Sequence, residues 1–265
     1  MARPRAEAGA CLSSVGEKCG ASRVGRSCNV RSMKLFIDTG SVAEVEEIAA
    51  WGVLSGATTN PSLLAKEDGD PGDIVRRICE LVDGPTSAEV VSDTAAGMVA
   101  EGRALAQLHD HVVVKVPFSP AGLQATSDLT KDGIRINMTL VFSATQAILA
   151  AEAGATYISC FMGRVDDISV SSEAVLAEIV AALGPGEADA QVLAASLRSP
   201  MHVVTAATLG CEVATTPGKV LHQMLKHPLT TAGIEGFTAD WQSDPRFGTW
   251  LSGLVDRAGT GAAVH

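Results

Sequence analysis

The amino-acid sequence predicts an α/β protein built as a single (β/α)8 barrel with an extra C-terminal helix. Three observations lead to this prediction. Short apolar runs alternate along the chain with longer amphipathic stretches, as parallel strands alternate with the helices that connect them. There are eight such runs, which fit a closed barrel in 265 residues better than an open sheet. Polar side chains gather at the C-terminal ends of these runs, where a barrel places its functional groups.

The eight apolar runs are the predicted strands. Strands covered by helices outside and packed inside should be nearly all apolar, and these runs are rich in Val, Ile, Leu and Ala. In chain order they cover residues 35–38, 56–59, 87–91, 112–117, 135–141, 156–162, 192–196 and 211–216.

The stretches between the strands carry helical periodicity and start signals, for example at 42–51, 95–109 and 173–183. Two serines, Ser41 and Ser143, precede Glu44 and Gln146 by three residues, which is the spacing of a capping box. Five further helix starts are marked by a polar residue before a proline. These starts are Asn60-Pro61, Asp70-Pro71, Ser119-Pro120, Ser199-Pro200 and Thr216-Pro217.

The composition excludes several kinds of partner. The chain is 46% hydrophobic but only 4% aromatic, so its core must be built from small aliphatic side chains. A net charge of −10 argues against broad electrostatic binding to nucleic acid or to a membrane surface. No apolar run approaches the roughly 18 residues of a membrane-spanning helix. We therefore expect neither a nucleic-acid nor a membrane partner.

The cysteines and histidines follow no disulfide or metal-site pattern. The six cysteines form no C-x-x-C pair, and the six histidines form no H-E-x-x-H motif. Cysteine usage of this kind is typical of a reducing compartment, so we expect a cytoplasmic protein. We expect no metal site and no cofactor.

The N-terminal 32 residues differ in composition from the rest of the chain. They hold six basic residues against two acidic ones, many serines and glycines, and little apolar periodicity. Two interpretations stay open: a transit-like peptide, or a disordered leader upstream of a start at Met33, which we favour. The expected organisation is thus a leader over 1–32, a catalytic barrel over 33–245 and a C-terminal tail over 246–265.

Lys115 is the most informative polar residue, because it interrupts an apolar strand. Burial of a cation is costly unless it is paired or neutralised. Desolvation lowers the pKa of a lysine, and a neutral amine can attack a carbonyl to form a Schiff base. The alternative is a lysine at a strand end that reaches solvent.

Further polar residues lie within or just after the strands, mostly toward their C-terminal ends. In a barrel these ends meet at one face, and so many polar side chains there suit a sugar-like ligand with several hydroxyl groups. They are Asp38, Thr58, Thr59, Asn60, Glu89, Asn137, Thr139, Ser159, Arg164, Ser196 and Arg198.

Two segments resemble the signatures of the transaldolase family, in its small single-domain branch, which also contains fructose-6-phosphate aldolases. The first is G-A-T-T-N-P-S-L-L over 56–64. The second lies within 112–129 and contains K-V-P at 115–117, followed by Ser119, Gly122-Leu123, Ala125 and Leu129. Residues 33–39 and 240–242 resemble the family's first strand and its C-terminal region. The resemblance supports the barrel.

The resemblance implies catalytic roles. Lys115 is similar to the Schiff-base lysine, and Asp38 to the residue that handles the proton of the substrate C4 hydroxyl. Glu89 is similar to an acid/base that acts through a bound water, with Thr139 helping to hold that water. From the residues alone, Asp38 could equally be a turn former and Glu89 an exposed strand residue.

The resemblance also implies substrate contacts. Asn60, Asn137 and Ser159 resemble residues that hold substrate hydroxyls, and Asn60 also has the position of a helix cap. Thr58 and Phe161 match supporting positions of the site. Arg164, Ser196 and Arg198 resemble a phosphate site, which suits the forked hydrogen bonds of guanidinium groups; without the resemblance, either arginine would be interpreted as an ion-pair partner at the surface.

The implied activity is that of a cofactor-independent transaldolase of the pentose phosphate pathway. It would transfer dihydroxyacetone from sedoheptulose 7-phosphate or fructose 6-phosphate to an aldose phosphate. The aldolases of the branch typically carry Gln, Ala and Tyr where this chain has Glu89, Ser159 and Phe161. A fructose-6-phosphate aldolase and a non-catalytic sugar-phosphate-binding barrel remain the alternatives.

Two further expectations follow from the resemblance. Small members of the family resemble ring-like pentamers and decamers with exchanged C-terminal helices, so we expect a homo-oligomer whose exchanged arm is 228–241. The alternative is a terminal helix docked on its own barrel. The chain departs from the family at Cys160, which replaces a usual proline without removing a catalytic group.

Overall fold

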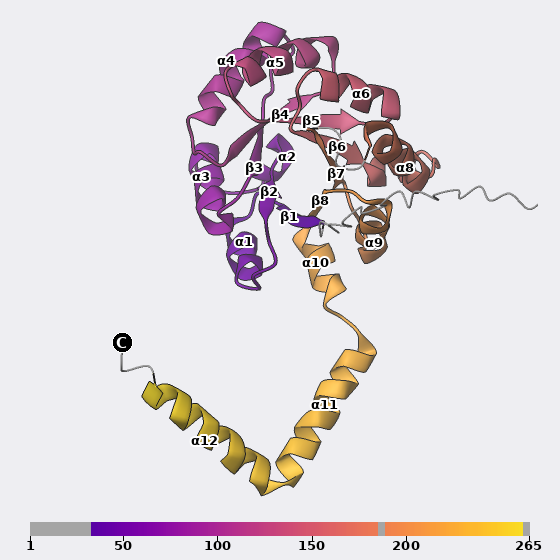
Figure 1. Ribbon diagram of the computed structural model, residues 1–265. Helices are drawn as coiled ribbons and strands as arrows, with labels where there is room; N and C mark the ends of the chain where they lie inside the picture. Colours follow the sequence, from indigo (N-terminus) through magenta and orange to yellow (C-terminus); the bar gives the residue numbers. More distant parts are fainter. Residues whose placement is uncertain (1–32, 185–188, 262–265) are drawn as a thin grey trace, which may run out of the picture. The chain divides into compact units, whose positions relative to one another are not determined.

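The computed structural model of the chain describes residues 33–184 and 189–261, so the predicted leader over 1–32 lies outside the described residues. Eight parallel strands pair in sequential order and close into a barrel, which confirms the predicted fold class (Figure 1). The strands are β1 (Lys34–Asp38), β2 (Gly56–Thr58), β3 (Thr86–Glu89), β4 (Val112–Pro117), β5 (Ile136–Val141), β6 (Tyr157–Phe161), β7 (Gln191–Ala195) and β8 (Val213–Thr216).

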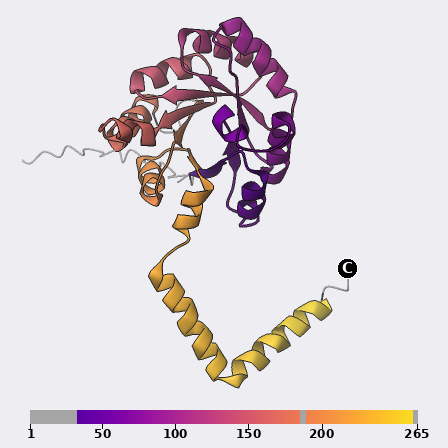
Figure 2. The ribbon, with the colours of Figure 1, turned by 180° about the vertical axis from the view of Figure 1, so that it is seen from behind.

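Helices surround the strands on all sides, as the views from both directions show (Figures 1 and 2). Val, Ile, Leu, Ala and Met side chains fill the space between strands and helices, because parallel strands are covered on their outer face. The helices are α1 (Val42–Ala49), α2 (Pro61–Leu64), α3 (Pro71–Val82), α4 (Ala95–Ala106), α5 (Pro120–Lys131), α6 (Ala144–Glu152), α7 (Met162–Asp167), α8 (Ser172–Leu183), α9 (Pro200–Leu209), α10 (Gly218–Met224), α11 (Pro228–Ser243) and α12 (Pro245–Gly261).

A separate apolar cluster fills the interior of the barrel. Its buried members come from five different strands: Phe36, Val113, Tyr157, Leu193, Ala195 and Val213. Phe36 and Tyr157 meet edge to face with ring centroids 5.9 Å apart. Gly56 gives the Phe36 ring its room, because a side chain at position 56 would lie 2.4 Å from that ring. The barrel is therefore a packed core and not a pore.

The interior cluster decides which residues reach the mouth of the barrel. Successive side chains of a strand point to opposite faces, so the residue two positions on from an interior residue also points inward. Each of four interior residues is followed, two positions later, by a polar residue. Phe36 is followed by Asp38, Val113 by Lys115, Tyr157 by Ser159 and Val213 by Thr215. A polar layer therefore lies directly above the apolar one, at the C-terminal ends of the strands.

Most of the predicted helix starts are confirmed. The side-chain oxygens of Asn60, Asp70, Ser119 and Ser199 each accept a hydrogen bond from the backbone N–H three residues later. The start predicted at Thr216-Pro217 is wrong. Thr216 is the last residue of β8, and α10 begins at Gly218 with Pro217 as its N-cap residue.

The two predicted capping boxes form only in part. The hydroxyl of Ser143 accepts from Gln146 N, but the Gln146 side chain accepts from Phe142 N instead of closing the box. Ser41 precedes α1 without a side-chain cap bond. The Glu44 carboxylate that would complete its box occupies the space beside Gly218, where a side chain would lie 2.1 Å from it.

The chain continues beyond the barrel in α11 and α12, so the predicted C-terminal helix runs to Ser243 and a further helix follows it. The two helices contact each other through Trp241, whose ring stacks on Phe247 and lies near Trp250. No residue of α11 is buried. None of the helices among the described residues is both long and apolar enough to cross a membrane.

Candidate active site

Two adjoining hollows open at the C-terminal ends of the strands, with volumes of about 120 Å³ and about 430 Å³. Together they reach the size of a small-molecule site. Both are lined by Asp38, Asn60, Lys115, Phe161 and Arg164. The smaller adds Thr58, Ser159, Ala195, Ser196 and Thr215, and the larger adds Pro61, Ser62, Leu63, Glu89, Thr139 and Leu140.

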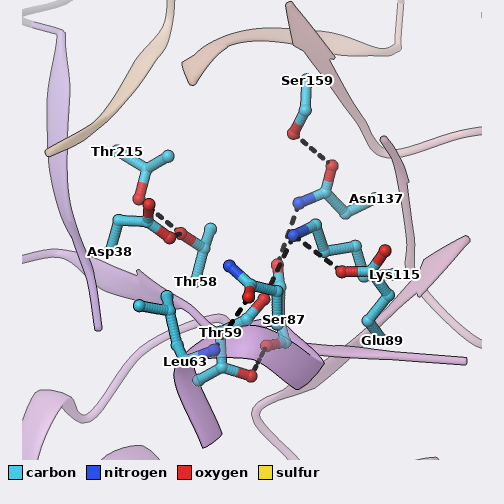
Figure 3. A network of polar contacts seen from close by, with 11 residues as sticks. Asp38, Thr58, Thr59, Leu63, Ser87, Glu89, Lys115, Asn137, Ser159 and Thr215 are labelled. Atoms are coloured by element: carbon cyan, nitrogen blue, oxygen red, sulfur yellow. Dashed lines mark hydrogen bonds and ion pairs between the residues drawn. The ribbon is translucent and has the colours of Figure 1, made fainter. Parts of the chain in front are cut away.

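Lys115 is buried at the base of this site, so the alternative of a lysine extending to solvent is wrong. Only 5% of the residue is exposed. Its Nζ lies 3.0 Å from Oε2 of Glu89 and donates to the backbone oxygen of Thr59 at 3.1 Å (Figure 3). The pairing follows from the sheet, because Glu89 of β3 is the direct register partner of Lys115 in β4. The buried cation thus has both a counter-charge and a hydrogen-bond acceptor.

The loop after Glu89 is fixed by a second carboxylate, Glu101 of α4. It accepts hydrogen bonds from Val91 N at 2.8 Å, from Ser92 N at 3.0 Å and from the Ser92 hydroxyl at 2.6 Å. Partial desolvation raises the pKa of Glu101, but the bonds from Ser92 and Val91 outweigh it and hold the pKa below its usual range. The backbone two residues beyond Glu89 is therefore anchored.

Asp38 occupies the opposite side of the site, in an environment that favours its protonated form. Burial raises the pKa of Asp38 above its ordinary value, although the bond from Thr58 and the charge of Lys115 act in the other direction. The hydroxyl of Thr58 donates to Oδ1 of Asp38 at 2.7 Å and lies 2.6 Å from the Thr215 hydroxyl. A carboxyl group held in this way is suited to accept or return a proton.

A second hydrogen-bonded chain orients Asn137. Its Nδ2 donates to the Ser87 hydroxyl at 3.0 Å, and its Oδ1 accepts from the Ser159 hydroxyl at 2.7 Å (Figure 3). Thr139, two residues along β5, presents a buried hydroxyl that has no partner among the described residues. Because Thr139 lines the larger hollow together with Glu89, its hydroxyl is available to a ligand or a water there.

The residues predicted to bind phosphate are only partly brought together. Arg164 lines both hollows, with its guanidinium carbon 5.0 Å from the centroid of the Phe161 ring. Ser196 lines the smaller hollow in a left-handed conformation with φ of 58°. Arg198 lines neither hollow, and its half-exposed guanidinium pairs with Asp167 of α7, which raises the pKa of Arg198. Its role in phosphate binding stays a prediction.

Two residues that take part in the hydrogen bonds of the site were missed by the sequence analysis. Thr215 follows the same rule as the polar residues that were found, because it lies near the C-terminal end of a strand, in β8. Ser87 lies in the middle of β3 and becomes important only through its bond to Asn137. Within the described ranges, no group of three or more His, Cys, Asp or Glu side chains is placed to hold a metal ion.

Comparison with known proteins identifies relatives over most of the chain. The transaldolase/fructose-6-phosphate aldolase family model matches residues 35–248. A probable transaldolase of Thermoanaerobacter sp. is 51% identical over 210 residues, which cover 79% of this chain and 97% of the relative. A probable transaldolase of Thermus thermophilus is also 51% identical, over 79% of this chain and 98% of the relative.

Solved structures of more distant proteins share only the fold. The thiamine phosphate pyrophosphorylase of Pyrococcus furiosus aligns with a TM-score of 0.50 at 15% identity, over 71% of this chain and 87% of that one. The carboxyl transferase domain of Rhizobium etli pyruvate carboxylase aligns with a TM-score of 0.53 at 10% identity, over 71% of this chain and 40% of that one.

The raised pKa of Asp38 predicts a pH dependence of stability. Because the folded pKa exceeds the unfolded value of about 3.9, the folded chain holds this proton more tightly. The contribution of Asp38 to the free energy of unfolding therefore falls as pH rises from about 4 through the folded pKa. We expect Asp38→Asn to gain stability relative to wild type across that interval, measured by urea unfolding at several pH values. The exposed Asp68→Asn is the control, and a difference between Asp38→Asn and wild type that does not change with pH would contradict the prediction.

Proposed function

The chain belongs to the transaldolase/fructose-6-phosphate aldolase family, and we propose that it transfers a dihydroxyacetone unit from a ketose phosphate to an aldose phosphate through a Schiff base on Lys115. The donor is sedoheptulose 7-phosphate or fructose 6-phosphate. The pairing of buried Lys115 with Glu89 at 3.0 Å is the observation that carries the proposal. A buried amine with an acid/base partner beside it is the arrangement that Schiff-base chemistry requires.

The first half of the reaction uses this pair. Passage of a proton from the ammonium of Lys115 to Glu89 leaves a neutral amine, which attacks the C2 carbonyl of the ketose. Glu89 then returns a proton to the hydroxyl of the carbinolamine, which leaves as water, and an iminium remains. The hydroxyl of Thr139, which has no partner in the described part of the chain, supports a position beside Glu89 for the water that carries these protons.

Cleavage of the carbon–carbon bond uses the other side of the site. Asp38 takes the proton of the C4 hydroxyl, the C3–C4 bond breaks, and an aldose phosphate leaves. The electron pair of that bond passes into the iminium as an enamine, so this chemistry requires no metal or other cofactor. Attack of the enamine on a second aldose phosphate, followed by hydrolysis, reverses the same steps and regenerates Lys115.

Neighbouring side chains would hold the substrate. Asn60 and Ser159 line the smaller hollow, and Asn137, which lines neither hollow, is hydrogen-bonded to Ser159. Their hydrogen bonds fix these side chains, so they can bind sugar hydroxyls with little loss of freedom. Arg164, Ser196 and Arg198 would bind the phosphate. An exposed ion pair such as Arg198–Asp167 contributes little, so a phosphate dianion can replace Asp167 as the partner of Arg198.

A fructose-6-phosphate aldolase is the second candidate, because the matching family contains both activities. It would protonate and release the dihydroxyacetone unit. Glu89, Ser159 and Phe161 favour the transaldolase, since the aldolases typically differ at all three positions. An assay with fructose 6-phosphate in the presence and absence of erythrose 4-phosphate distinguishes the two activities.

The proposal extends to location and assembly. The three cysteines among the described residues are all free, which suits a reducing compartment such as the cytoplasm. The exposed apolar side chains of α11, namely Leu229, Ile234 and Phe237, support a homo-oligomer, pentameric or decameric, in which this helix contacts a second copy.

Substitution of Lys115 tests the Schiff base. Lys115→Met keeps a similar volume but removes the amine, so we expect loss of turnover and loss of the covalent adduct trapped by borohydride with fructose 6-phosphate. The matched control is Lys131→Met, in which an exposed lysine is removed from α5. An adduct that persists in Lys115→Met would place the Schiff base elsewhere, and absence of any adduct in wild type would favour a non-catalytic sugar-phosphate-binding barrel.

Substitution of Glu89 tests its role as acid/base. Glu89→Gln keeps the shape and a hydrogen bond but cannot exchange a proton. We expect transaldolase turnover to fall by roughly 10²–10⁴-fold, the usual size of a general acid–base contribution. Substrate binding should change little, and the trapped adduct should form more slowly. Glu178→Gln on the exposed face of α8 is the control. A near-native rate in Glu89→Gln would show that Glu89 has only a structural role.

Substitution of the arginines tests the phosphate site. Arg164→Ala and Arg198→Ala should each raise KM for phosphorylated sugars by about 10- to 100-fold, as loss of a charged hydrogen-bond partner does. KM for free dihydroxyacetone or glyceraldehyde should stay nearly constant. Arg103→Ala, which removes an arginine paired with Asp132 on the outer helices, is the control. Equal losses with phosphorylated and free sugars would exclude that arginine from the phosphate site.

A further inference from the structure

Thr215 joins the active site through a hydrogen bond and not through any motif. The residue lies in β8 and is 2% exposed. Its hydroxyl lies 2.6 Å from that of Thr58, which in turn donates to Oδ1 of Asp38 at 2.7 Å (Figure 3). The three side chains come from β8, β2 and β1, which are neighbours in the barrel because β1 pairs with both of the others.

Counting protons fixes the direction of these bonds. A threonine hydroxyl has one proton to donate and two lone pairs to accept with. When Asp38 is ionised, as a base must be, Thr58 uses its proton for Asp38, so Thr215 is the donor in the bond between the two threonines. The chain runs from Thr215 to Thr58 to Asp38, and no hydrogen bond from the described residues is directed at Oδ2 of Asp38. That oxygen stays available to a substrate hydroxyl.

The position of Thr215 has no packing reason to be polar. Val213, two residues earlier on the same face of β8, belongs to the apolar interior cluster. Valine has nearly the same shape as threonine and would fill the same space. The hydroxyl is therefore explained by its bond to Thr58 and by the cavity that Thr215 lines.

We propose that Thr215 is a positioning residue for the base Asp38: by donating to Thr58, it holds the Thr58 proton on Oδ1 and leaves Oδ2 for the substrate. The inference rests on the proposed function, because Asp38 acts as a base only in that reaction. Bonds in such a chain polarise one another, so the bond from Thr215 also strengthens the one from Thr58 to the carboxylate. Proton transfer to Asp38 then proceeds from a fixed geometry.

The charges around Asp38 agree with such a role. Burial raises the pKa of Asp38 and the charges of Glu89 and Glu44 act in the same sense, whereas Lys115 lowers it. Of the influences that lower the pKa, the hydrogen bond from Thr58 is the largest. A weaker Thr58 bond should therefore raise the pKa of Asp38 and move the acidic limb of the rate profile to higher pH.

The test is a double-mutant cycle read by pH profiles of kcat and kcat/KM in the full chain. We expect Thr215→Val to move the acidic limb up by about 0.2–0.6 pH unit. Loss of a hydrogen bond to a charged group shifts the pKa of that group by about one to two units, and loss of the next bond in the chain shifts it by a fraction of that amount. kcat should fall about two- to tenfold, the effect of one neutral hydrogen bond, with KM within about twofold. Thr215→Ser should restore wild-type behaviour.

The second half of the cycle separates positioning from other roles. Thr58→Val should shift the limb further, and Thr215→Val should add nothing in the Thr58→Val background, because Thr215 acts through Thr58. An undiminished effect of Thr215→Val in the Thr58→Val background would overturn the inference. So would a change in Thr215→Val that is confined to KM, or a loss of stability without a shift of the acidic limb.

A measurement that does not depend on turnover keeps this inference apart from the proposed function. The titration of the Asp38 carboxyl, followed by ¹³C NMR, should move up in Thr215→Val and return in Thr215→Ser. If wild type forms no borohydride-trapped adduct while this titration shifts as expected, the proposed function fails and the hydrogen-bonded chain stands. If wild type turns over and the titration does not shift, the inference fails alone.

Discussion

The burial of one cation, Lys115, is the constraint on which the rest of the site depends. A buried ammonium group is unfavourable unless a counter-charge and acceptors surround it. The barrel meets this need with the register of its strands: β3 places Glu89 directly beside Lys115, and Thr59, the residue after β2, supplies its backbone oxygen. The flanking residues Val114 and Val116 point outward and are fully buried. Side chains alternate between the two faces of β4, so the valines that pack against the helices also direct the amine of Lys115 into the mouth of the barrel.

Around this cation, the polar residues divide into two hydrogen-bonded groups. Asp38, Thr58 and Thr215 form one group on β1, β2 and β8, and Ser87, Asn137 and Ser159 form the other on β3, β5 and β6 (Figure 3). The first group holds a carboxyl that can exchange a proton, and the second holds a neutral amide in one orientation. Glu89 belongs to neither group and pairs with Lys115. In the reaction proposed above, this separation would let the two carboxyl groups act on different protons of the substrate.

Much of this arrangement could be predicted from the sequence, because it follows from local rules. Eight apolar runs predict eight strands, and a polar residue before proline predicts a helix start with few errors. The errors arise where tertiary contacts decide: Glu44 lies against Gly218 instead of closing a cap, and Thr216 stays in β8 because it pairs with Ile37 of β1. The strand-end rule could have listed Thr215 as a polar candidate, but its role could not be predicted, since it depends on a bond to Thr58, 157 positions away in the sequence. The pairing of Arg198 with Asp167 is also unpredictable from spacing.

Local sequence rules do not predict the backbone conformation of two residues that line the site. Leu140 and Ser196 adopt positive φ values of 61° and 58°, and both line the site. Leu140 lies where the pairing of β5 with β6 shifts register between Met138 and Val141. Such a bulge redirects side chains, and it lets Leu140 line the larger hollow together with its neighbour Thr139. Strained backbone and an unpaired buried hydroxyl at Thr139 both cost stability, and neither is needed to close a barrel. Asp83 and Ser169 share the positive φ, and His111 and Thr126 share the unpaired buried atom, but only Leu140, Ser196 and Thr139 line the site, where a ligand can make use of them.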